Sequence, residues 1–288
     1  MDRWVFLNGE FVPSEKAHVS IYDHGFLYGD GAFEGIRAYN GRAFKLKEHI
    51  DRLYNCLKNL WIDMPYGREQ FISNVEMLLE MNAVTDGYIR VTVSRGVALG
   101  LDPKNIHGEP TVVISTDKLA LYPKSMYETG LEVVTVATRV ANPQVLEPRI
   151  KSLGKYVANI QAKIEANHVG AGEGLMLTED GYVAECTGDN IFFVRKGLVH
   201  TPAAFLGILE GITRGTVMDL LGEMGITVVE GTYTRFDLYT ADESFLTGTA
   251  AEVIPMVKLD DRLINDGKPG PITRKLIDAF HGYVKKQG

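Results

Sequence analysis

The sequence predicts a two-domain protein of mixed α and β structure, of the α+β or mixed α/β class. Its 288 residues exceed the roughly 100–200 residues typical of one domain. Both halves combine short strand pairs with amphipathic helical patterns. A segment without periodicity, 119–124, lies between the halves and contains Pro123. We therefore expect an N-terminal α+β domain over 1–118, an interdomain loop over 119–128 and a C-terminal cofactor-binding domain over 129–288.

The elements of the first half are predicted by turn signals and apolar spacing. An Asn-Gly pair separates residues 5–7 from 11–12, and a second separates 36–39 from 43–46, which is typical of tight β-hairpins. Residues 47–61 place Ile50, Leu53, Tyr54, Leu57, Leu60 and Trp61 on one helical face. The remaining predictions are a helix over 68–81 and strands over 88–94 and 111–115.

The second half continues with strands and helices. Residues 131–138 alternate like a strand, and the helix predicted after residue 155 places Val157, Ile160 and Ile164 on one face. The other predictions are hairpins pairing 175–178 with 182–184 and 191–194 with 198–200, a helix over 212–224, a strand over 226–229 and a helix over 271–286.

Composition excludes several classes of protein. The chain is 45% hydrophobic and 23% charged, as in ordinary globular proteins. Its net charge of -7 argues against general affinity for nucleic acid or anionic lipid. No apolar run approaches the roughly 20 residues that span a bilayer, and the start lacks the apolar region of a signal peptide. Cys56 and Cys186 form no metal or redox spacing, so we expect a cytoplasmic protein without a metal.

The stretch RIKSLGKY, residues 149–156, is the most informative one. We expect Lys151 at a strand-to-helix junction, anchored on both sides, with Tyr156 at the mouth of the helix. An amine and a phenol together suit pyridoxal phosphate (PLP), which needs a Schiff-base lysine and a donor to its ring hydroxyl. Glu185, among small residues at a strand end, could keep the pyridine nitrogen protonated. Taken singly, Lys151 could equally be a solvated lysine and Glu185 a turn residue.

A phosphate site is predicted at the start of the 212–224 helix. Gly211-Ile212-Thr213-Arg214-Gly215 would offer backbone N–H groups and the helix dipole to an anion. Ordinary N-capping by Thr213 explains the same pattern. The turn Gly248-Thr249-Ala250-Ala251-Glu252 adds a hydroxyl, and Arg52 on the flank of the first helix could reach the same anion.

A substrate wall is predicted from aromatic and cationic residues. Residues 28–37 mix aromatic side chains with glycines, and Tyr88 and Arg90 share one face of a strand. This pair could bind a carboxylate, or it could be a buried aromatic beside a surface ion pair. Gly29-Asp30-Gly31 and Gly170-Ala171-Gly172 do not complete a dinucleotide fingerprint. The scattered histidines are interpreted as structural: His18, His24, His49 and His107.

Together these segments resemble the fold-type IV PLP enzymes, and most of all the branched-chain amino acid aminotransferases. The resemblance implies a two-domain fold like that of D-amino acid aminotransferase, with the active site between the domains, in a homodimer or higher homo-oligomer. Seven motifs in the family's order carry it: residues 28–37, 49–53, 88–90, 151–156, 185–190, 211–214 and 248–252.

The resemblance also implies a role for each site residue. Lys151 would be the Schiff-base lysine and proton shuttle, Tyr156 would bond the ring oxygen, and Glu185 the pyridine nitrogen. Tyr28 could come from a neighbouring subunit. The phosphate would be held by Arg52, Ile212 (through its N–H), Thr213 and Thr249, and the substrate by Tyr28, Phe33, Gly35, Arg37, Tyr88, Arg90, Thr249 and Ala250.

The activity implied is transamination of leucine, isoleucine and valine with 2-oxoglutarate. Alternatives on the same fold are a D-amino acid transaminase, an amine transaminase and an aminodeoxychorismate lyase. Residues 103–107 do not supply the Arg-x-His carboxylate trap of the D-specific enzymes, whereas the loop 95–102 is shorter than in many family members and leaves donor preference open. A non-catalytic PLP protein and a cofactor-free interaction protein also stay open.

Overall fold

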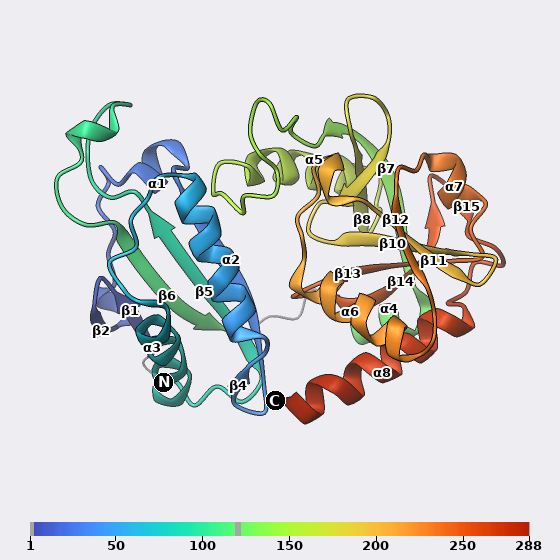
Figure 1. The fold of residues 1–288 in the computed structure, drawn as a ribbon, viewed down its shortest axis with the longest axis horizontal. Helices are drawn as coiled ribbons and strands as arrows, with labels where there is room; N and C mark the ends of the chain where they lie inside the picture. Colours follow the sequence, from blue (N-terminus) through green and yellow to red (C-terminus); the bar gives the residue numbers. More distant parts are fainter. Residues whose placement is uncertain (1–2, 119–121, 288) are drawn as a thin grey trace. The chain divides into compact units, whose positions relative to one another are not determined.

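The computed structural model describes residues 3–118 and 122–287, and the chain forms two compact units (Figure 1). The first unit takes its described residues from Met1–Leu119, Ile150–Gly154 and Val284–Gly288. The second takes them from Ala120–Arg149 and Lys155–Tyr283. The short segment Ile150–Gly154 therefore belongs to a different unit from the residues on either side of it in the chain. None of the described helices combines the length and apolar character needed to cross a membrane.

The first unit is an antiparallel sheet with helices packed on one face. The strand order is β2-β1-β6-β5-β3-β4, and α2 packs on β3 while α3 packs on β1 and β6 (Figure 1). The core beneath the helices is built from residues such as Ile36, Ile50, Leu53 and Ile89. The elements are β1 (Trp4–Leu7), β2 (Glu10–Pro13), η1 (Ser14–Lys16), α1 (His24–Tyr28), β3 (Gly31–Tyr39), β4 (Arg42–Ala43), α2 (Leu46–Asn59), α3 (Arg68–Met81), β5 (Gly87–Ser94), η2 (Pro103–Asn105) and β6 (Thr111–Asp117).

Most predicted elements of the first unit are confirmed. The first hairpin turns through Asn8 and Gly9, whose φ angles of 49° and 99° lie in the left-handed region that Asn-Gly pairs adopt. The strand over 43–46 is wrong, because β4 ends at Ala43 and Leu46 already begins α2. The prediction that Trp61 lies on the apolar face of α2 is also wrong: it follows the helix end and is 89% exposed.

The second unit is a mixed sheet of strand order β12-β11-β10-β13-β14-β7-β8-β9, with β15 paired to β14. The pairs β11–β12, β14–β7 and β7–β8 are parallel. Helix α5 packs on β7 and β8, and α6 on β13 and β12. The elements are α4 (Lys124–Thr129), β7 (Leu131–Arg139), α5 (Tyr156–His168), β8 (Glu173–Leu177), β9 (Val183–Cys186), β10 (Asn190–Arg195), β11 (Leu198–Pro202), η3 (Ala204–Leu206), α6 (Ile212–Glu223), β12 (Val228–Gly231), α7 (Arg235–Tyr239), β13 (Glu243–Gly248), β14 (Glu252–Leu259), β15 (Arg262–Leu263) and α8 (Pro271–Gln287).

The two predicted hairpins, β7, α6 and α8 of the second unit are confirmed. The predicted loop 119–128 overlaps α4, which begins directly after Pro123, while residues 119–121 lie outside the described residues. Strands β13 and β14 were not predicted; Pro255 inside β14 weakens a strand pattern, since proline cannot donate to a ladder.

Helix α5 forms as predicted, but its buried face differs. Val157, Ile160 and Ile164 are exposed by 59%, 60% and 47% in the single chain. The helix instead packs through small residues, Ala162 and Ala166, which let it lie close to β7 and β8. The apolar period correctly placed these three residues on one face of the helix, but it did not show what covers that face.

Candidate active site

Five of the six predicted substrate residues of the first unit gather on one face of its sheet. Arg37 lies opposite Tyr88, and Gly35 opposite Arg90, in the antiparallel register of β3 and β5. Phe33 is two residues before Gly35 and therefore shares its face, because strand side chains alternate. The other face carries residues of the core beneath α2 and α3. The structure thus brings together five residues that were predicted from two separate motifs.

Lys151 lies at this face of the sheet. The Phe33 N–H donates to the Lys151 carbonyl at 3.0 Å, and the Lys151 N–H donates to the Cys56 thiol at 3.3 Å. Its amine is 4.7 Å from the centre of the Phe33 ring, and the Arg90 guanidinium is 3.5 Å from the same centre. The backbone of Lys151 is thus hydrogen-bonded on both sides, and its amine lies near the same aromatic ring as a cation that could bind a carboxylate.

Gly35 is required by the approach of Tyr88. A Cβ built at Gly35 would lie 2.1 Å from the Tyr88 hydroxyl, so any larger residue would displace the phenol. Glycine here lets an aromatic side chain lie flat over the strand. This shapes the wall that the sequence predicted from Tyr88 and the glycines around Phe33.

Arg52 is held by a buried carboxylate that the sequence analysis did not single out. Its Nε and Nη2 donate to the two oxygens of Glu34 at 2.7 and 2.8 Å, and His49 Nδ1 lies 2.7 Å from Glu34 Oε2. Burial alone would raise the pKa of Glu34, but the charge of Arg52 and the hydrogen bonds from His49 and Arg52 lower it to about 2. Burial also lowers the pKa of His49. The available signal was an acidic residue inside an apolar strand, opposite a helix carrying His and Arg three positions apart.

The charges of Arg52 and Lys151 both act on the thiol of Cys56. Burial raises the pKa of the Cys56 thiol, while the charges of Arg52 and Lys151 and the hydrogen bond from the Lys151 N–H partly oppose this. The predicted phosphate-binding arginine and the predicted Schiff-base lysine therefore belong to one neighbourhood of the first unit.

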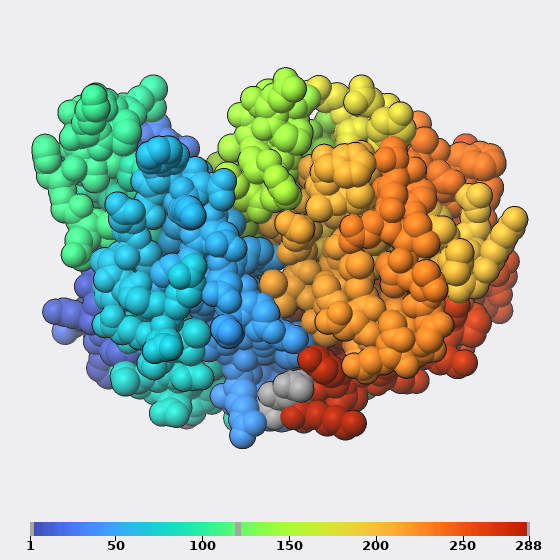
Figure 2. All heavy atoms as spheres, viewed as in Figure 1, coloured from blue at the N-terminus to red at the C-terminus, as the bar shows by residue number. Residues whose placement is uncertain are grey.

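Tyr28 ends α1 and lies beside the loop after β5. Its hydroxyl accepts a hydrogen bond from the Gly100 N–H at 3.2 Å, and its ring packs edge-on against His24. The residue is 43% exposed, so it is available to a partner or a substrate. Figure 2 shows the green segment that includes η2 standing at one end of the first unit.

In the second unit, Glu185 is a buried acceptor with donors on both oxygens. Oε2 accepts from the Leu209 N–H at 2.8 Å and from Asn190 Nδ2 at 3.4 Å. Oε1 accepts from the Lys155 ammonium at 3.1 Å. A carboxylate can accept about four hydrogen bonds, so Glu185 retains capacity for a further N–H donor such as a pyridinium.

Asn190 connects Glu185 with the predicted phosphate site. It pairs with Thr247 across β10 and β13, and its amide oxygen is so close to Gly211 that a Cβ there would lie 2.2 Å from it. Gly211, and not Thr213, is the N-cap residue of α6, and no side chain caps it. The interpretation of Thr213 as an N-cap is therefore wrong, and the first-turn N–H groups are arranged as an anion site requires.

Thr249 and Ala250 occupy the turn between β13 and β14, as their motif predicted. Its first residue, Gly248, is also constrained by space, because a Cβ there would collide with the Asp189 carboxylate. Tyr156 is the first residue of α5 and lies in the same unit as Glu185. The carboxylate of Glu185 fits the pyridine nitrogen of PLP. The N-terminus of α6 and the hydroxyl of Thr249 fit its phosphate.

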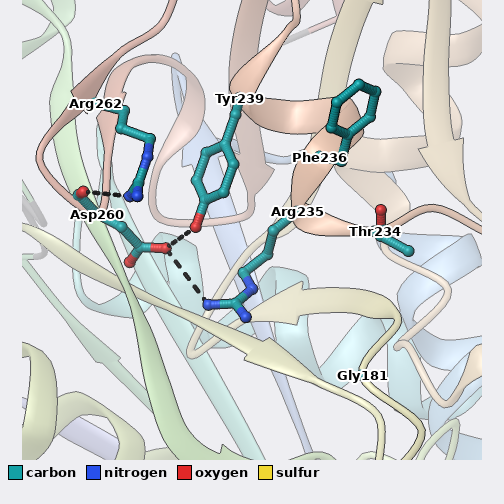
Figure 3. Close-up of a pocket in the computed structure, with 7 residues that line it drawn as sticks. All are labelled: Gly181, Thr234, Arg235, Phe236, Tyr239, Asp260 and Arg262. Atoms are coloured by element: carbon teal, nitrogen blue, oxygen red, sulfur yellow. Dashed lines mark hydrogen bonds and ion pairs between the residues drawn. The ribbon is translucent and has the colours of Figure 1, made fainter.

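A hollow of about 530 Å³ elsewhere in the second unit contains none of the predicted site residues in its lining. Figure 3 shows Tyr239 and Arg235 pointing toward Asp260, whose carboxylate accepts from the Tyr239 hydroxyl at 2.6 Å. The same carboxylate also accepts from the backbone and hydroxyl of Thr135, which joins β14 to β7 beyond a bulge. The carboxylate of Asp260 therefore stabilises the packing of the sheet.

Comparisons with known proteins agree with this chemistry. The family described as amino-transferase class IV matches residues 31–259. A putative branched-chain-amino-acid aminotransferase of Methanocaldococcus jannaschii is 48% identical over 99% of this chain and 97% of its own length. The branched-chain aminotransferase of Thermoproteus uzoniensis, solved with norvaline, has a TM-score of 0.92 at 34% identity, covering 99% of this chain and 95% of its own. A T.th. branched-chain amino acid aminotransferase complexed with N-(5'-phosphopyridoxyl)-L-glutamate has a TM-score of 0.93 at 35% identity, covering 100% and 96%.

Proposed function

Because this chain belongs to the class IV aminotransferases, which use PLP, we propose that it transaminates leucine, isoleucine and valine with 2-oxoglutarate, giving 2-oxo acids and L-glutamate. The observation that carries the proposal is that the amine of Lys151 and the guanidinium of Arg90 lie 4.7 and 3.5 Å from the centre of one aromatic ring, that of Phe33. The names of the relatives support the branched-chain donors, and the glutamate adduct bound to the T.th. enzyme supports glutamate as a product. The D-specific, amine and lyase alternatives are not favoured by these relatives.

In this proposal each predicted cofactor residue has its own contact with PLP. Lys151 would hold PLP covalently and would carry the proton of the donor's α-carbon. Tyr156 would donate to the ring oxygen, Glu185 would accept from the ring nitrogen, and the phosphate would be held by Arg52, Ile212, Thr213 and Thr249. Bound PLP supplies the electron sink for cleavage of the α-carbon–hydrogen bond.

The substrate is proposed to lie against the sheet face of the first unit. Arg90 and Arg37 would bind carboxylates, while Phe33 and Tyr88 offer apolar surface to an aliphatic side chain. Tyr28, Gly35, Thr249 and Ala250 would complete the walls. A 2-oxoglutarate molecule needs a second cation because it has a second carboxylate, and the same face provides one.

We also propose that the enzyme works in the cytoplasm as a homodimer or higher homo-oligomer. Val157, Ile160 and Ile164 form an exposed apolar stripe on α5, and Phe26, Leu99 and Leu101 are exposed by 73%, 71% and 79%. Such large apolar groups are typical of surfaces that a second copy covers. Two buried free cysteines suit a reducing compartment.

The test follows the absorption of the bound cofactor under single-turnover conditions while L-leucine, then D-alanine, is added. We expect L-leucine alone to convert the cofactor to its aminated form, and 2-oxoglutarate to reverse the change. Lys151→Ala should abolish multiple turnover because the proton carrier is lost. Conversion by D-alanine instead, or sustained turnover by Lys151→Ala, would overturn the proposal.

A further inference from the structure

A second lysine lies in the same motif as Lys151, in a different environment. Lys155 immediately precedes α5, belongs to the second unit, and its side chain is only 4% exposed. Its ammonium donates to the Pro148 carbonyl at 2.7 Å and to Glu185 Oε1 at 3.1 Å. Lysine is almost never this buried unless it is paired. The geometry therefore indicates a specific task for this side chain.

Its partner is the carboxylate assigned to the ring nitrogen. The Glu185 side chain is 6% exposed and lies on β9, paired with β8. Its other oxygen accepts from the Leu209 N–H and from Asn190. Of these three donors only Lys155 carries a full positive charge, and the other two are neutral amides.

Resting on the proposed function, we propose that Lys155 is a positioning residue that keeps Glu185 ionised and fixed, so that Glu185 can accept a hydrogen bond from the protonated ring nitrogen of PLP. A buried carboxylate without a charged partner is neutralised by taking up a proton. The resulting carboxylic acid would offer its own proton to the ring nitrogen, and the nitrogen would lose the charge that makes the ring an electron sink.

The direction of the effect follows from distance. The ammonium contacts the carboxylate itself, and a ring nitrogen bonded to that carboxylate would be farther from the ammonium than the carboxylate is. Coulomb attraction to the nearer negative charge therefore exceeds repulsion from the more distant positive one. Lys155 thus favours the arrangement with the negative charge on Glu185 and the proton on the ring.

The same contacts separate the duties of the two lysines. Lys155 is engaged as an ammonium by a carboxylate and a carbonyl, whereas an amine that attacks a carbonyl group must be deprotonated. Lys151, four positions earlier, belongs to the first unit and lies over Phe33. We therefore assign covalent attachment to Lys151 and charge support to Lys155.

The first experiment is infrared spectroscopy of the cofactor-stripped full chain. Lys155→Met should show the carbonyl stretch of a protonated carboxylic acid that is absent from the wild type, from Lys155→Arg and from the double variant Lys155→Met/Glu185→Gln. The double variant removes both charges together and so avoids an unpaired buried group. A Lys155→Met spectrum without this band would overturn the proposal.

The second experiment compares binding of PLP with binding of its analogue in which carbon replaces the ring nitrogen. Lys155→Met should weaken PLP by about tenfold or more, as expected for loss of a charge-assisted hydrogen bond, and Lys155→Arg should restore most of the affinity. The carbon analogue should bind the wild type and Lys155→Met within about twofold of each other. Equal weakening of both ligands would show a structural role only and would overturn the proposal.

Failure of the proposed function would look different. If the wild-type protein did not bind PLP or did not transfer amino groups, the titration and the turnover assay would fail before any variant was made. The infrared result depends only on the chain, so it tests the charge role of Lys155 even in that case. Should Lys155→Met not fold, Lys155→Arg still tests the proposal, which requires this variant to retain PLP affinity and to show no protonated carboxylic acid band.

Discussion

Each unit has a buried glutamate that contacts a predicted site residue or is one itself, and the two differ in their partners. Glu34 in the first unit is fully buried and is held by the two-pronged guanidinium of Arg52 and by His49. Glu185 in the second unit has a single-point ammonium and neutral amide donors. The contacts of Glu34 fix the guanidinium of Arg52 in one position. The contacts of Glu185 leave this carboxylate able to accept a further hydrogen bond from a ligand.

The comparison shows that burial and charge alone do not identify a cofactor-binding carboxylate. Both groups are buried, and both are paired with a cation. What separates them is the geometry of the partner, since a guanidinium fork occupies both oxygens at once whereas an ammonium contacts one. Glu34 therefore acts through Arg52, and Glu185 acts directly.

The largest expected effect is on the free energy of unfolding, when the ion pair between Glu34 and Arg52 is broken. Glu34→Ala leaves Arg52 without its carboxylate in an interior site, and breaking such a pair costs about 3–5 kcal/mol of the free energy of unfolding. Denaturant unfolding of the cofactor-free protein measures it. Glu48→Ala is the matched control on the same helix as Arg52, because Glu48 is half-exposed and forms a surface ion pair with Lys45; its cost should stay below about 1 kcal/mol. Equal costs for both variants would remove the distinction drawn for Glu34.

A somewhat smaller effect is expected on the stability of the folded chain at low pH. The pKa of Glu34 falls from 4.5 to about 2 on folding, so its stabilisation is complete above pH 4.5 and is lost as the pH falls toward 2. The loss amounts to about 3 kcal/mol. His49 acts in the same direction. Its pKa is lowered in the folded chain, so below pH 6.5 the unfolded chain binds a proton more readily than the folded chain, and the folded state loses stability.

Unfolding measured between pH 6.5 and 2 should therefore show falling stability in the wild type. Glu34→Gln should flatten the part below pH 4.5, because glutamine does not titrate, while the part due to His49 persists. An unchanged slope below pH 4.5 would contradict the assignment of the acid sensitivity to Glu34.

The sequence was most informative where chemistry follows local periodicity. Alternation along one strand placed Tyr88 and Arg90 on one face, and the small-residue signal before α6 marked a helix N-terminus. These features depend on residues close together in the chain, so their spacing carries the geometry.

The contacts that complete the site could not be predicted because they join distant segments. Lys155 and Glu185 are separated by 30 positions, and only the packing of α5 against the sheet explains their meeting. The exposure of the stripe on α5 could not be predicted for a related reason: Val157 and Ile160 show an apolar period, but a period does not reveal what covers the apolar face.

The smallest effect tests whether Asn190 connects the phosphate site to Glu185. In Gly211→Ala the new Cβ would lie 2.2 Å from Asn190 Oδ1, so the amide must move and its contact with Glu185 weakens. We expect about tenfold weaker PLP binding, in line with loss of one hydrogen bond, and a stability cost of about 1 kcal/mol.

Gly222→Ala is the control, because it lies within the same helix with open space around its position. It should raise the free energy of unfolding by about 0.4–1 kcal/mol and leave PLP affinity unchanged. If Gly211→Ala also kept wild-type affinity for PLP, Glu185 would be held without Asn190. Its position would then depend on Lys155 and the Leu209 amide, and the contrast with the tightly held Glu34 would become sharper.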